Sequence, residues 1–340
     1  PMREDALFIM MSSTKPILGV AAMMLIEEGL IRPSDPVSKW IPEFAEMQVA
    51  VLRDNVDEDI SPPFVLPTNV PEHRLVPAER EITVHDILTH TSGIASGGLG
   101  SAISEDAIMW LDTRTSLASN VPIYGDIVLD FQPGDRWRYS AATALDVIAR
   151  IIEIESGLSF DEFAQQRIFE PLGMNDTWWN VPEEYQDRLI DIVDSDAATP
   201  PNSAIYDTSH STYFGASYGL KSTAGDYLRF EQMLVNGGEL FGNRLLKPQT
   251  VELMSSNQVG DLFSAMPGVS DQGFGYTVAT TEVSNERRSK GAFGWGGALG
   301  TRSWSDPAEE LTAVIMIQQP VPAVQNDFES AVHQAITDAN

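Results

Sequence analysis

The stretch FIMMSSTKPILGVAAMMLIEEG, Phe8 to Gly29, decides the fold of this chain. Pro16 suits the first turn of a helix, and Gly29 stands where a left-handed residue ends one. Between them, apolar residues recur at helical spacing: Leu18, Ala21, Ala22, Leu25 and Ile26. The stretch therefore predicts a helix whose first turn carries Ser12 and Lys15 on one face.

Ser12 and Lys15 form an S-x-x-K motif at this helix start. A serine hydroxyl is a poor nucleophile at neutral pH, and a lysine three residues along a helix can reach its oxygen. The pair is thus a candidate serine–lysine acyl-transfer site. The alternative is a Ser/Thr helix cap followed by a surface lysine, and the motif alone does not decide between the two.

Length and composition limit the fold and the compartment. A chain of 340 residues with 43% hydrophobic content predicts two lobes or one large α/β unit. It contains no run of about 18 apolar residues, which a transmembrane helix needs. With no cysteine, the chain has no disulfide, thiolate metal site or cysteine nucleophile.

The net charge of −28 limits the partners. It argues against nucleic acid and against an anionic membrane, because both repel an acidic surface. No signal peptide is visible, which favours the cytoplasm. However, the opening PMREDALFIMM enters a short strand or turn at once, so we expect upstream residues to be missing, and a signal peptide among them would change the localisation.

A second informative stretch is FQPGDRWRYSAATALDVIARIIEIESG, Phe131 to Gly157. Ser140 is predicted to cap a helix whose buried side carries Ala144, Val147, Ile148, Ile151 and Ile152. Tyr139 then stands just before the helix start. A phenol close to a lysine can act as a proton shuttle. The alternative is a tyrosine packed under the helix with its hydroxyl in water.

Helices are expected through the middle of the chain. They are Val84 to His90 capped by Thr83, Phe160 to Phe169, a helix from Ser222-Thr223 to Val235, and a short one capped by Thr250. Segments 46–80, 94–130 and 180–215 look irregular: the first is predicted to form surface loops, and the second either lines a cleft or is a solvent-exposed loop.

The period changes to two from Gly273 onward. Residues 273–283 and 290–297 each predict one strand, and residues 300–319 predict a hairpin that turns at Asp306-Pro307. A helix from Val324 to Ala339 closes the chain. We therefore expect an α+β fold, with residues 1–29 and 216–340 forming an antiparallel sheet flanked by helices and residues 30–215 forming a mainly helical lobe.

Six motifs then follow one another in the order found in the serine β-lactamase-like hydrolases. They are LFIMMSSTKPILGVAAMMLIEEG, ITVHDILTHTSGI, PGDRWRYS, RIFEPLGMNDTWW, GLKSTAGDYLRF and GWGGALGTRSW. The chain looks most like the family VIII carboxylesterases, which are similar to class C β-lactamases and penicillin-binding proteins. The resemblance implies a β-lactamase/transpeptidase-like fold and covers nearly the whole chain.

The resemblance assigns a role to each of three residues. It makes Ser12 the acylated nucleophile and Lys15 its activating partner. Tyr139 opens a triplet like Y-x-N and becomes the general base that later returns a proton to the leaving group. It also implies further family strands before the nucleophile, and without them the sheet would have an exposed edge.

The same resemblance places Trp295, Gly296 and Gly297 where β-lactamases carry K-T-G, on a strand beside the cleft. The backbone N–H groups of Ser12 and Ala298 would then form the oxyanion hole.

Two departures from the pattern favour esters over β-lactams. Ala141 replaces the asparagine of Y-x-N, and Trp295 removes the cation that would bind a β-lactam carboxylate. Arg302 is either a substitute cation or a surface strand residue, and the second interpretation is preferred.

A rival serine motif is GASYG, Gly215 to Gly219, which matches G-x-S-x-G. With Asp306 or Asp327 and then His333 it would follow the residue order of an α/β-hydrolase. The polar YDTSHSTYF before it is no buried strand, and no helix follows Ser217 directly, so a glycine-rich turn is the preferred interpretation.

The histidines offer no metal site. His85 and His90 are five residues apart and not at the spacing of a helical metal pair, so both are interpreted as structural. His73 and His210 are placed in loops.

These observations predict a serine hydrolase without metal or cofactor that cleaves carboxylic esters of short to medium acyl chain. A β-lactamase, a D-amino-acid peptidase or an acyltransferase is the alternative on the same scaffold, and a catalytically silent binding protein is the alternative from another class. The expected partner is a small-molecule ester. Neither the natural ester nor the oligomeric state follows from the sequence.

Overall fold

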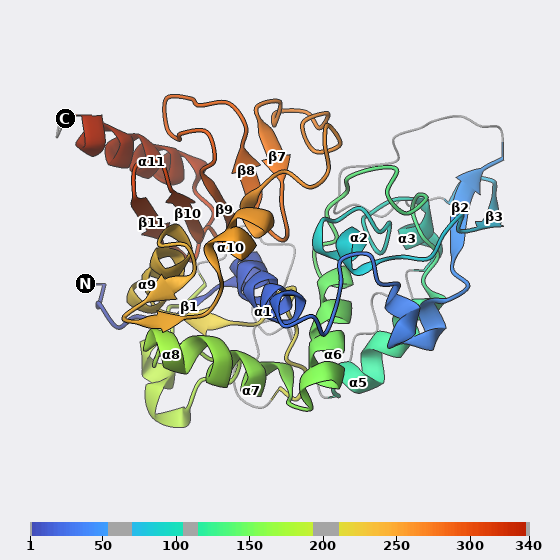
Figure 1. Ribbon diagram of the computed structural model, residues 1–340, viewed down its shortest axis with the longest axis horizontal. Coiled ribbons are helices and arrows are strands. Elements are labelled where there is room, and N and C mark those ends of the chain that lie inside the picture. The colour runs from blue at the N-terminus through green and yellow to red at the C-terminus, as the bar shows by residue number, and fades with distance from the viewer. Residues whose placement is uncertain (1, 54–69, 105–114, 193–210, 338–340) are drawn as a thin grey trace.

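The computed structural model describes residues 2–53, 70–104, 115–192 and 211–337. Helix α1, Lys15–Glu27, lies at the centre of the molecule (Figure 1). All its residues from Lys15 to Leu25 are buried, as expected for a helix that is apolar around its circumference. The predicted helix is confirmed, and Gly29 is left-handed with φ of +75°. Ser12 itself lies just before α1, in the 3₁₀ helix Met11–Thr14.

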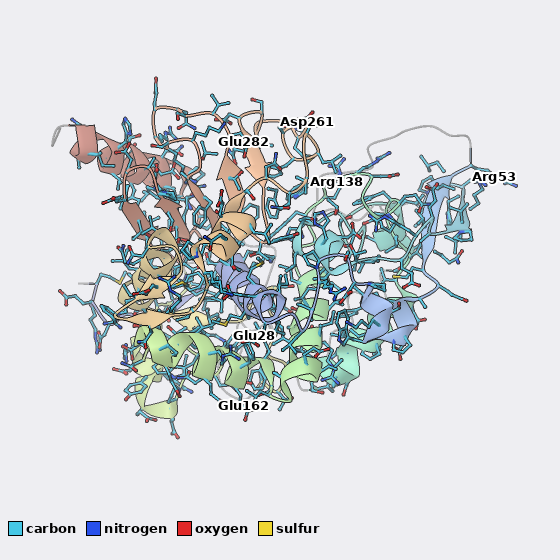
Figure 2. The ribbon with its side chains drawn as sticks, viewed as in Figure 1. Glu28, Arg53, Arg138, Glu162, Asp261 and Glu282 are labelled. Atoms are coloured by element: carbon cyan, nitrogen blue, oxygen red, sulfur yellow. The ribbon has the colours of Figure 1, made fainter. Side chains whose placement is uncertain are left out.

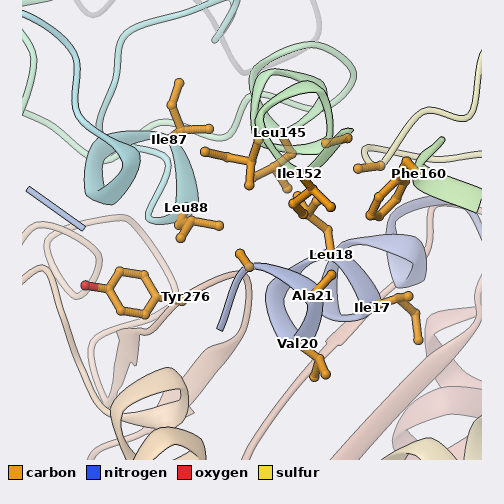
Figure 3. Close-up of a cluster of buried hydrophobic side chains, with 14 of the residues drawn as sticks. Ile17, Leu18, Val20, Ala21, Ile87, Leu88, Leu145, Ile152, Phe160 and Tyr276 are labelled. Atoms are coloured by element: carbon orange, nitrogen blue, oxygen red, sulfur yellow. The ribbon is translucent and has the colours of Figure 1, made fainter. Parts of the chain in front are cut away.

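Helix α6, Ala144–Ser156, packs against α1. Its predicted apolar side is confirmed, because Ala144, Val147, Ile148, Ile151 and Ile152 have no exposed surface. Figure 3 shows Leu145 and Ile152 of α6 above Leu18 of α1, with Leu88 of α2, Val84–Leu88, beside them. Ser140 does not precede α6 directly, but its hydroxyl accepts a hydrogen bond from Ala144 N–H at 3.1 Å.

A five-stranded antiparallel sheet holds the C-terminal part of the chain. Its order is β11-β10-β9-β8-β7. The strands are β7 Gln272–Phe274, β8 Ala279–Thr281, β9 Phe293–Gly296, β10 Arg302–Asp306 and β11 Leu311–Ile315. The predicted hairpin is confirmed, with Asp306 pairing with Leu311 across the turn, and β11 forms one edge of the sheet.

Helices cover both faces of this sheet. Ser303 and Ser305 point to Glu231 of α9, Ala224–Val235, and both hydroxyls donate to its carboxylate. Trp304, between them, contacts Phe328 of α11, Pro322–Thr337. Successive side chains of β10 thus point to opposite faces of the sheet and contact α9 on one face and α11 on the other. Thr223 caps α9 as predicted and accepts from Asp226 N–H at 3.2 Å.

The prediction of one strand over residues 273–283 was wrong. The segment forms β7, a turn and β8, with Gly275 N–H donating to Val278 O at 2.8 Å. At the turn, Thr277 takes φ of +68°, which is rare for a β-branched residue. Contacts with distant elements hold it there: Thr277 N–H donates to Leu88 O at 3.0 Å, and Thr277 Oγ1 lies where a side chain at Gly19 would be.

Two other expectations were also wrong. Segment 46–80 contains the hairpin β2 Gln48–Leu52 and β3 His73–Pro77, although residues 54–69 between them lie outside the described residues. Helix α10, Pro248–Ser255, begins before Thr250, so this threonine is not its cap. Its hydroxyl instead donates to Glu27 at 2.5 Å.

The remaining elements are short. The strand pairs are β1 Phe8–Ile9 with β4 Lys221–Ser222, and β5 Glu239–Leu240 with β6 Asn243–Arg244. The helices are α3 Leu99–Ile103, α5 Leu117–Asn120, α7 Phe160–Ala164 and α8 Glu170–Leu172, and the π-turn Gln165–Phe169 joins the last two within the predicted 160–169 helix. No helix in the described ranges is both long and apolar enough to cross a membrane.

The division into residues 1–29 plus 216–340 and residues 30–215 stays a prediction. Helix α1 contacts α6 and α7 from the middle of the chain and α10 from its later part. One cluster of buried apolar side chains extends over both sets of residues, from Ala6 to Phe293. The core is therefore continuous around α1.

Candidate active site

The structure brings Ser12 and Lys15 together. Lys15 Nζ lies 3.1 Å from Ser12 Oγ. The same nitrogen donates to two backbone carbonyls, Ala141 O at 2.7 Å and Ser217 O at 2.6 Å. Lys15 has no exposed surface, whereas Ser12 is partly exposed. The amine is thus held by three oxygens from three segments of the chain.

The turn that carries Ser12 is strained and tightly held. Met11, just before it, has φ of +48°, a conformation that non-glycine residues adopt only where their surroundings impose it. Thr14 Oγ1 donates to Met11 O at 2.7 Å, and Tyr227 OH donates to Ser13 O at 2.7 Å from α9. These contacts fix the direction in which the Ser12 hydroxyl leaves the chain.

Tyr139 borders the same cavity as Ser12. Its ring lies beneath Lys15 Nζ, 5.0 Å from the nitrogen. His90 holds the backbone on either side of it: His90 O accepts from Arg138 N–H at 3.0 Å, and His90 Nδ1 accepts from Ser140 N–H at 3.3 Å. The extended segment before α6 thereby presents the phenol to the cavity.

His90 is buried among aromatic rings. Its ring contacts Trp137, Tyr139 and Phe274. Burial, and then the charge of Lys15, hold the pKa of His90 well below its ordinary value. The side chain is therefore neutral at physiological pH and supports Tyr139 as a packing partner. His85 similarly lies against Tyr276, with Nδ1 3.2 Å from its hydroxyl, and His210 is outside the described residues.

The segment Trp295 to Ala298 forms one wall of the cavity. Trp295, Gly296, Gly297 and Ala298 all border the cavity, and the Trp295 indole N–H points to Tyr139 OH at 3.4 Å. This segment can approach the backbone of Met10 closely because residue 297 is a glycine. A Cβ at Gly297 would lie 2.2 Å from Met10 O. The predicted site residues are thus brought together, while their roles, including that of the Ser12 and Ala298 amides, stay predictions.

The cavity has a volume of about 1130 Å³. Arg302 borders it but does not take the place of the missing K-T-G lysine. In the sheet register Arg302 lies opposite Gly296, whereas Trp295 lies opposite Ser303, so Arg302 and Trp295 point to opposite faces. Arg302 is paired with Glu329 of α11 at 2.7 Å.

Many charged side chains lie on the outside of the molecule, consistent with the acidic composition. Figure 2 shows Arg53, Glu162 and Asp261 at its outline. None of these residues borders the cavity.

Segment 94–130 was expected either to line the cleft or to form a solvent-exposed loop. In the described part of this segment no residue lines the cavity, so the first expectation has no support there.

The rival serine, Ser217, is fully buried and does not border the cavity. Asp306 is engaged elsewhere and accepts from Ser289 N–H at 2.9 Å and Ala308 N–H at 3.2 Å. A nucleophile without access to the substrate cannot act, so the geometry speaks against the α/β-hydrolase arrangement.

Comparison with known proteins then decides the family. The sequence profile of the family described as Beta-lactamase matches residues 1–336. The chain belongs to the beta-lactamase family. It is 32% identical to Protein Rv1367c of Mycobacterium tuberculosis over 98% of this chain and 82% of that protein. It is also 26% identical to Esterase EstB of Burkholderia gladioli, over 99% of this chain and 83% of the esterase.

A solved structure matches this family member over its whole fold. EstCE1, described as a hydrolase with promiscuous acyltransferase activity, superposes with a TM-score of 0.74 at 21% identity, over 99% of this chain and 86% of the other. The fold is β-lactamase/transpeptidase-like, as predicted. The resemblance to the family VIII esterases is confirmed, and the beta-lactamase family assignment places this chain among serine hydrolases with esterase relatives.

Sequence reasoning on this beta-lactamase family member missed the groups that act through their backbone. The carbonyls of Ala141 and Ser217 hold Lys15, and the carbonyl of His90 holds Arg138. A carbonyl leaves no signature in residue type. Only the position of Ala141, two residues after Tyr139, hinted that this segment approaches the lysine.

Proposed function

We propose that this chain is a carboxylesterase that cleaves esters of short to medium acyl chain through an acyl-enzyme on Ser12. The observation that carries the proposal is the contact of Lys15 Nζ with Ser12 Oγ at 3.1 Å, at the mouth of a cavity that Tyr139 also borders. A buried amine beside a partly exposed serine is the arrangement that activates a hydroxyl for acyl transfer.

The surroundings of Trp295 support an uncharged ester over a β-lactam. A neutral indole stands where the K-T-G lysine would bind a carboxylate, and it packs on Tyr139 with ring centres 5.4 Å apart. Ala141 offers no amide side chain to the cavity. The name of EstB, an esterase, agrees with this substrate class.

In the first step, Ser12 Oγ attacks the ester carbonyl carbon while its proton passes to Lys15 or Tyr139. The carbonyl oxygen becomes an oxyanion, and the N–H groups of Ser12 and Ala298 donate to it. Donors of this kind typically supply about 3 to 4 kcal/mol of transition-state stabilisation. The alcohol then leaves with a proton from Tyr139, and an ester bond to Ser12 remains.

In the second step, a water attacks this acyl-enzyme as Tyr139 takes one of its protons. The carboxylic acid leaves, and Ser12 Oγ recovers a proton. Lys15 keeps its two carbonyl partners throughout, so its nitrogen stays directed at Ser12. The cycle needs only water and the groups that the chain supplies.

The test is turnover of p-nitrophenyl butyrate, nitrocefin and a D-alanyl peptide, combined with fluorophosphonate labelling and peptide mapping. We expect ester turnover at least a hundredfold above that of nitrocefin, and label on Ser12. The Ser12→Ala variant should lose both, while Ser330→Ala, an exposed serine on α11, should keep both.

Each other result would count against the proposal. Label on Ser217 would support an α/β-hydrolase, and nitrocefin turnover equal to that of the ester would support a β-lactamase. A folded protein with neither label nor turnover would be the silent binding protein. Transfer of the butyryl group to an added alcohol in preference to water would make the chain an acyltransferase.

A further inference from the structure

The GASYG segment, Gly215 to Gly219, is not a nucleophile turn, yet it lies directly behind Lys15. Ser217 O accepts from Lys15 Nζ at 2.6 Å, the shortest of the three contacts of this nitrogen. The contact is fully buried, so water does not compete for it. Any displacement of this carbonyl would therefore redirect the amine that faces Ser12.

The carboxylate of Asp146, on α6, accepts hydrogen bonds from the backbone of this segment. Asp146 Oδ1 accepts from Ala216 N–H at 2.8 Å and from Ser217 N–H at 2.9 Å. Asp146 Oδ2 accepts from the hydroxyl of Tyr213, which in turn lies 2.9 Å from Tyr124 OH. Asp146 has no exposed surface.

Three further hydrogen bonds hold the ends of the segment. Trp179 Nε1 donates to Gly215 O at 2.9 Å. At the other end, Leu220 O accepts from Met10 N–H at 2.9 Å, and Leu220 N–H donates to Thr14 Oγ1 at 3.3 Å. The segment is thereby fixed at both ends, and Asp146 is the group that fixes its centre.

We propose that Asp146 is a positioning residue for the reaction: its Oδ1 holds the Ala216 and Ser217 amides so that Ser217 O directs Lys15 Nζ at Ser12. The inference rests on the proposed function. Burying a carboxylate is costly, and the chain meets this cost with three hydrogen bonds on one helix side chain. A residue needed only for packing at this site would be apolar.

The geometry separates the acceptor role of Asp146 from its charge. Both amides bind the same oxygen, Oδ1. An asparagine can present its Oδ1 to the two amides and its Nδ2 to the Tyr213 hydroxyl, which then donates to Tyr124. The Asp146→Asn variant therefore keeps the hold on the segment, while Asp146→Ala removes it.

The experiment compares these two variants with Asp226→Ala. Asp226 is a matched control because it is also a buried carboxylate that accepts a backbone amide, Asp176 N–H at 2.7 Å, but it does not border the cavity. Steady-state kinetics on p-nitrophenyl butyrate are normalised to the Ser12 sites labelled by fluorophosphonate at completion. Hydrogen exchange of peptide 214–220 is followed by mass spectrometry.

For Asp146→Ala we expect kcat per labelled site to fall at least tenfold, with KM within threefold of the starting value. Labelling of Ser12 should slow by the same factor, and the amides of peptide 214–220 should exchange at least tenfold faster. Asp146→Asn should restore kcat and exchange to within threefold. Asp226→Ala should lower the melting temperature but leave kcat per site and the exchange of this peptide unchanged.

Two kinetic results would overturn the inference: an unchanged kcat per site in Asp146→Ala, or an asparagine variant as slow as the alanine variant. The failure of the proposed function is a different result, namely an unsubstituted protein with no ester turnover and no label on Ser12. Hydrogen exchange does not depend on turnover. Unchanged exchange in Asp146→Ala would show that Asp146 does not hold the segment and would also overturn the inference.

Discussion

At the scale of the residue, the arrangement around Lys15 defines its chemistry. Lys15 Nζ donates to the carbonyls of Ala141 and Ser217 and to Ser12 Oγ. These three oxygens hold the nitrogen within hydrogen-bond distance of Ser12 Oγ.

Tyr139 can be tested by removing a single oxygen. We expect Tyr139→Phe to lower kcat for p-nitrophenyl butyrate at least a hundredfold, because positioned acid–base groups typically contribute about 10² to 10⁴. The ring should remain packed against His90 and Trp137, so the melting temperature should change little. The matched control is Tyr185→Phe, a more exposed tyrosine stacked on Trp178. Equal kinetics in the two variants would remove Tyr139 from the mechanism.

At the scale of the element, helix α9 and strand β10 share a buried carboxylate. Glu231 is almost wholly buried and accepts from Ser303 Oγ and Ser305 Oγ. Burial raises its pKa from the ordinary 4.5 to about 7, while these hydrogen bonds and the charge of Arg288 oppose the rise. Glu231 therefore couples the packing of α9 on the sheet to pH.

The sign of this coupling follows from proton binding. Between pH 4.5 and about pH 7 the folded protein holds a proton on Glu231 that the unfolded chain has released. The contribution of Glu231 to stability is complete below pH 4.5 and is lost as pH rises through 7. A difference in pKa of this size corresponds to about 3 kcal/mol.

We expect Glu231→Gln to flatten the pH dependence of stability, because glutamine stays neutral. Urea unfolding at pH 5 and at pH 8 measures it. From pH 5 to pH 8 the free energy of unfolding should fall by about 2 to 3 kcal/mol less in the variant than in the unsubstituted chain. All other carboxylates are common to both proteins and cancel in this comparison. Parallel losses in the two proteins would show that Glu231 does not carry this charge effect.

Elements whose pattern is local could be predicted from the sequence. Helix α6 has a clear apolar stripe and the left-handed Gly157 at its end, and α9 begins at a threonine cap. The turn at Thr277 could not be predicted from local sequence. Its backbone N–H donates to Leu88 O, and its side-chain oxygen occupies space that is free only because Gly19 has no side chain. Residues distant in sequence supply those contacts, so no local pattern records them.

The candidate site was predictable to the same extent. Ser12, Lys15 and Tyr139 have side chains whose chemistry and spacing indicate acyl transfer, and the structure brings them to one cavity or within contact of it. Asp146 was predicted only as part of a helix. Its contact with the GASYG segment joins residues 70 positions apart and follows from tertiary packing alone.

At the scale of the whole molecule, the site is where an N-terminal segment meets the C-terminal sheet. The 3₁₀ helix Met11–Thr14 contacts β9. Thr301 Oγ1 joins them, donating to Met10 O at 3.1 Å and lying 2.9 Å from Ser13 Oγ. The position of Ala298 relative to Ser12 therefore depends on how closely the sheet approaches the start of α1.

Gly297 sets this approach, and Gly297→Ala tests it. A Cβ there would lie 2.2 Å from Met10 O and 2.4 Å from Thr301 Oγ1, and the first of these is backbone that cannot turn aside. The end of β9 must move away, which carries the Ala298 amide away from Ser12. Since misplacement by about 1 Å can cost about a hundredfold, we expect kcat/KM for p-nitrophenyl butyrate to fall at least tenfold.

Gly225→Ala is the control for Gly297→Ala, because the same methyl group is added where the surroundings are open. Gly225 lies in the first turn of α9, and a Cβ there meets no atom within 4 Å. Alanine should raise stability by up to about 1 kcal/mol and leave kcat/KM unchanged. If Gly297→Ala kept full kcat/KM alongside this control, the close approach of the sheet would not be what places Ala298. The oxyanion role of its amide would then lose its structural basis.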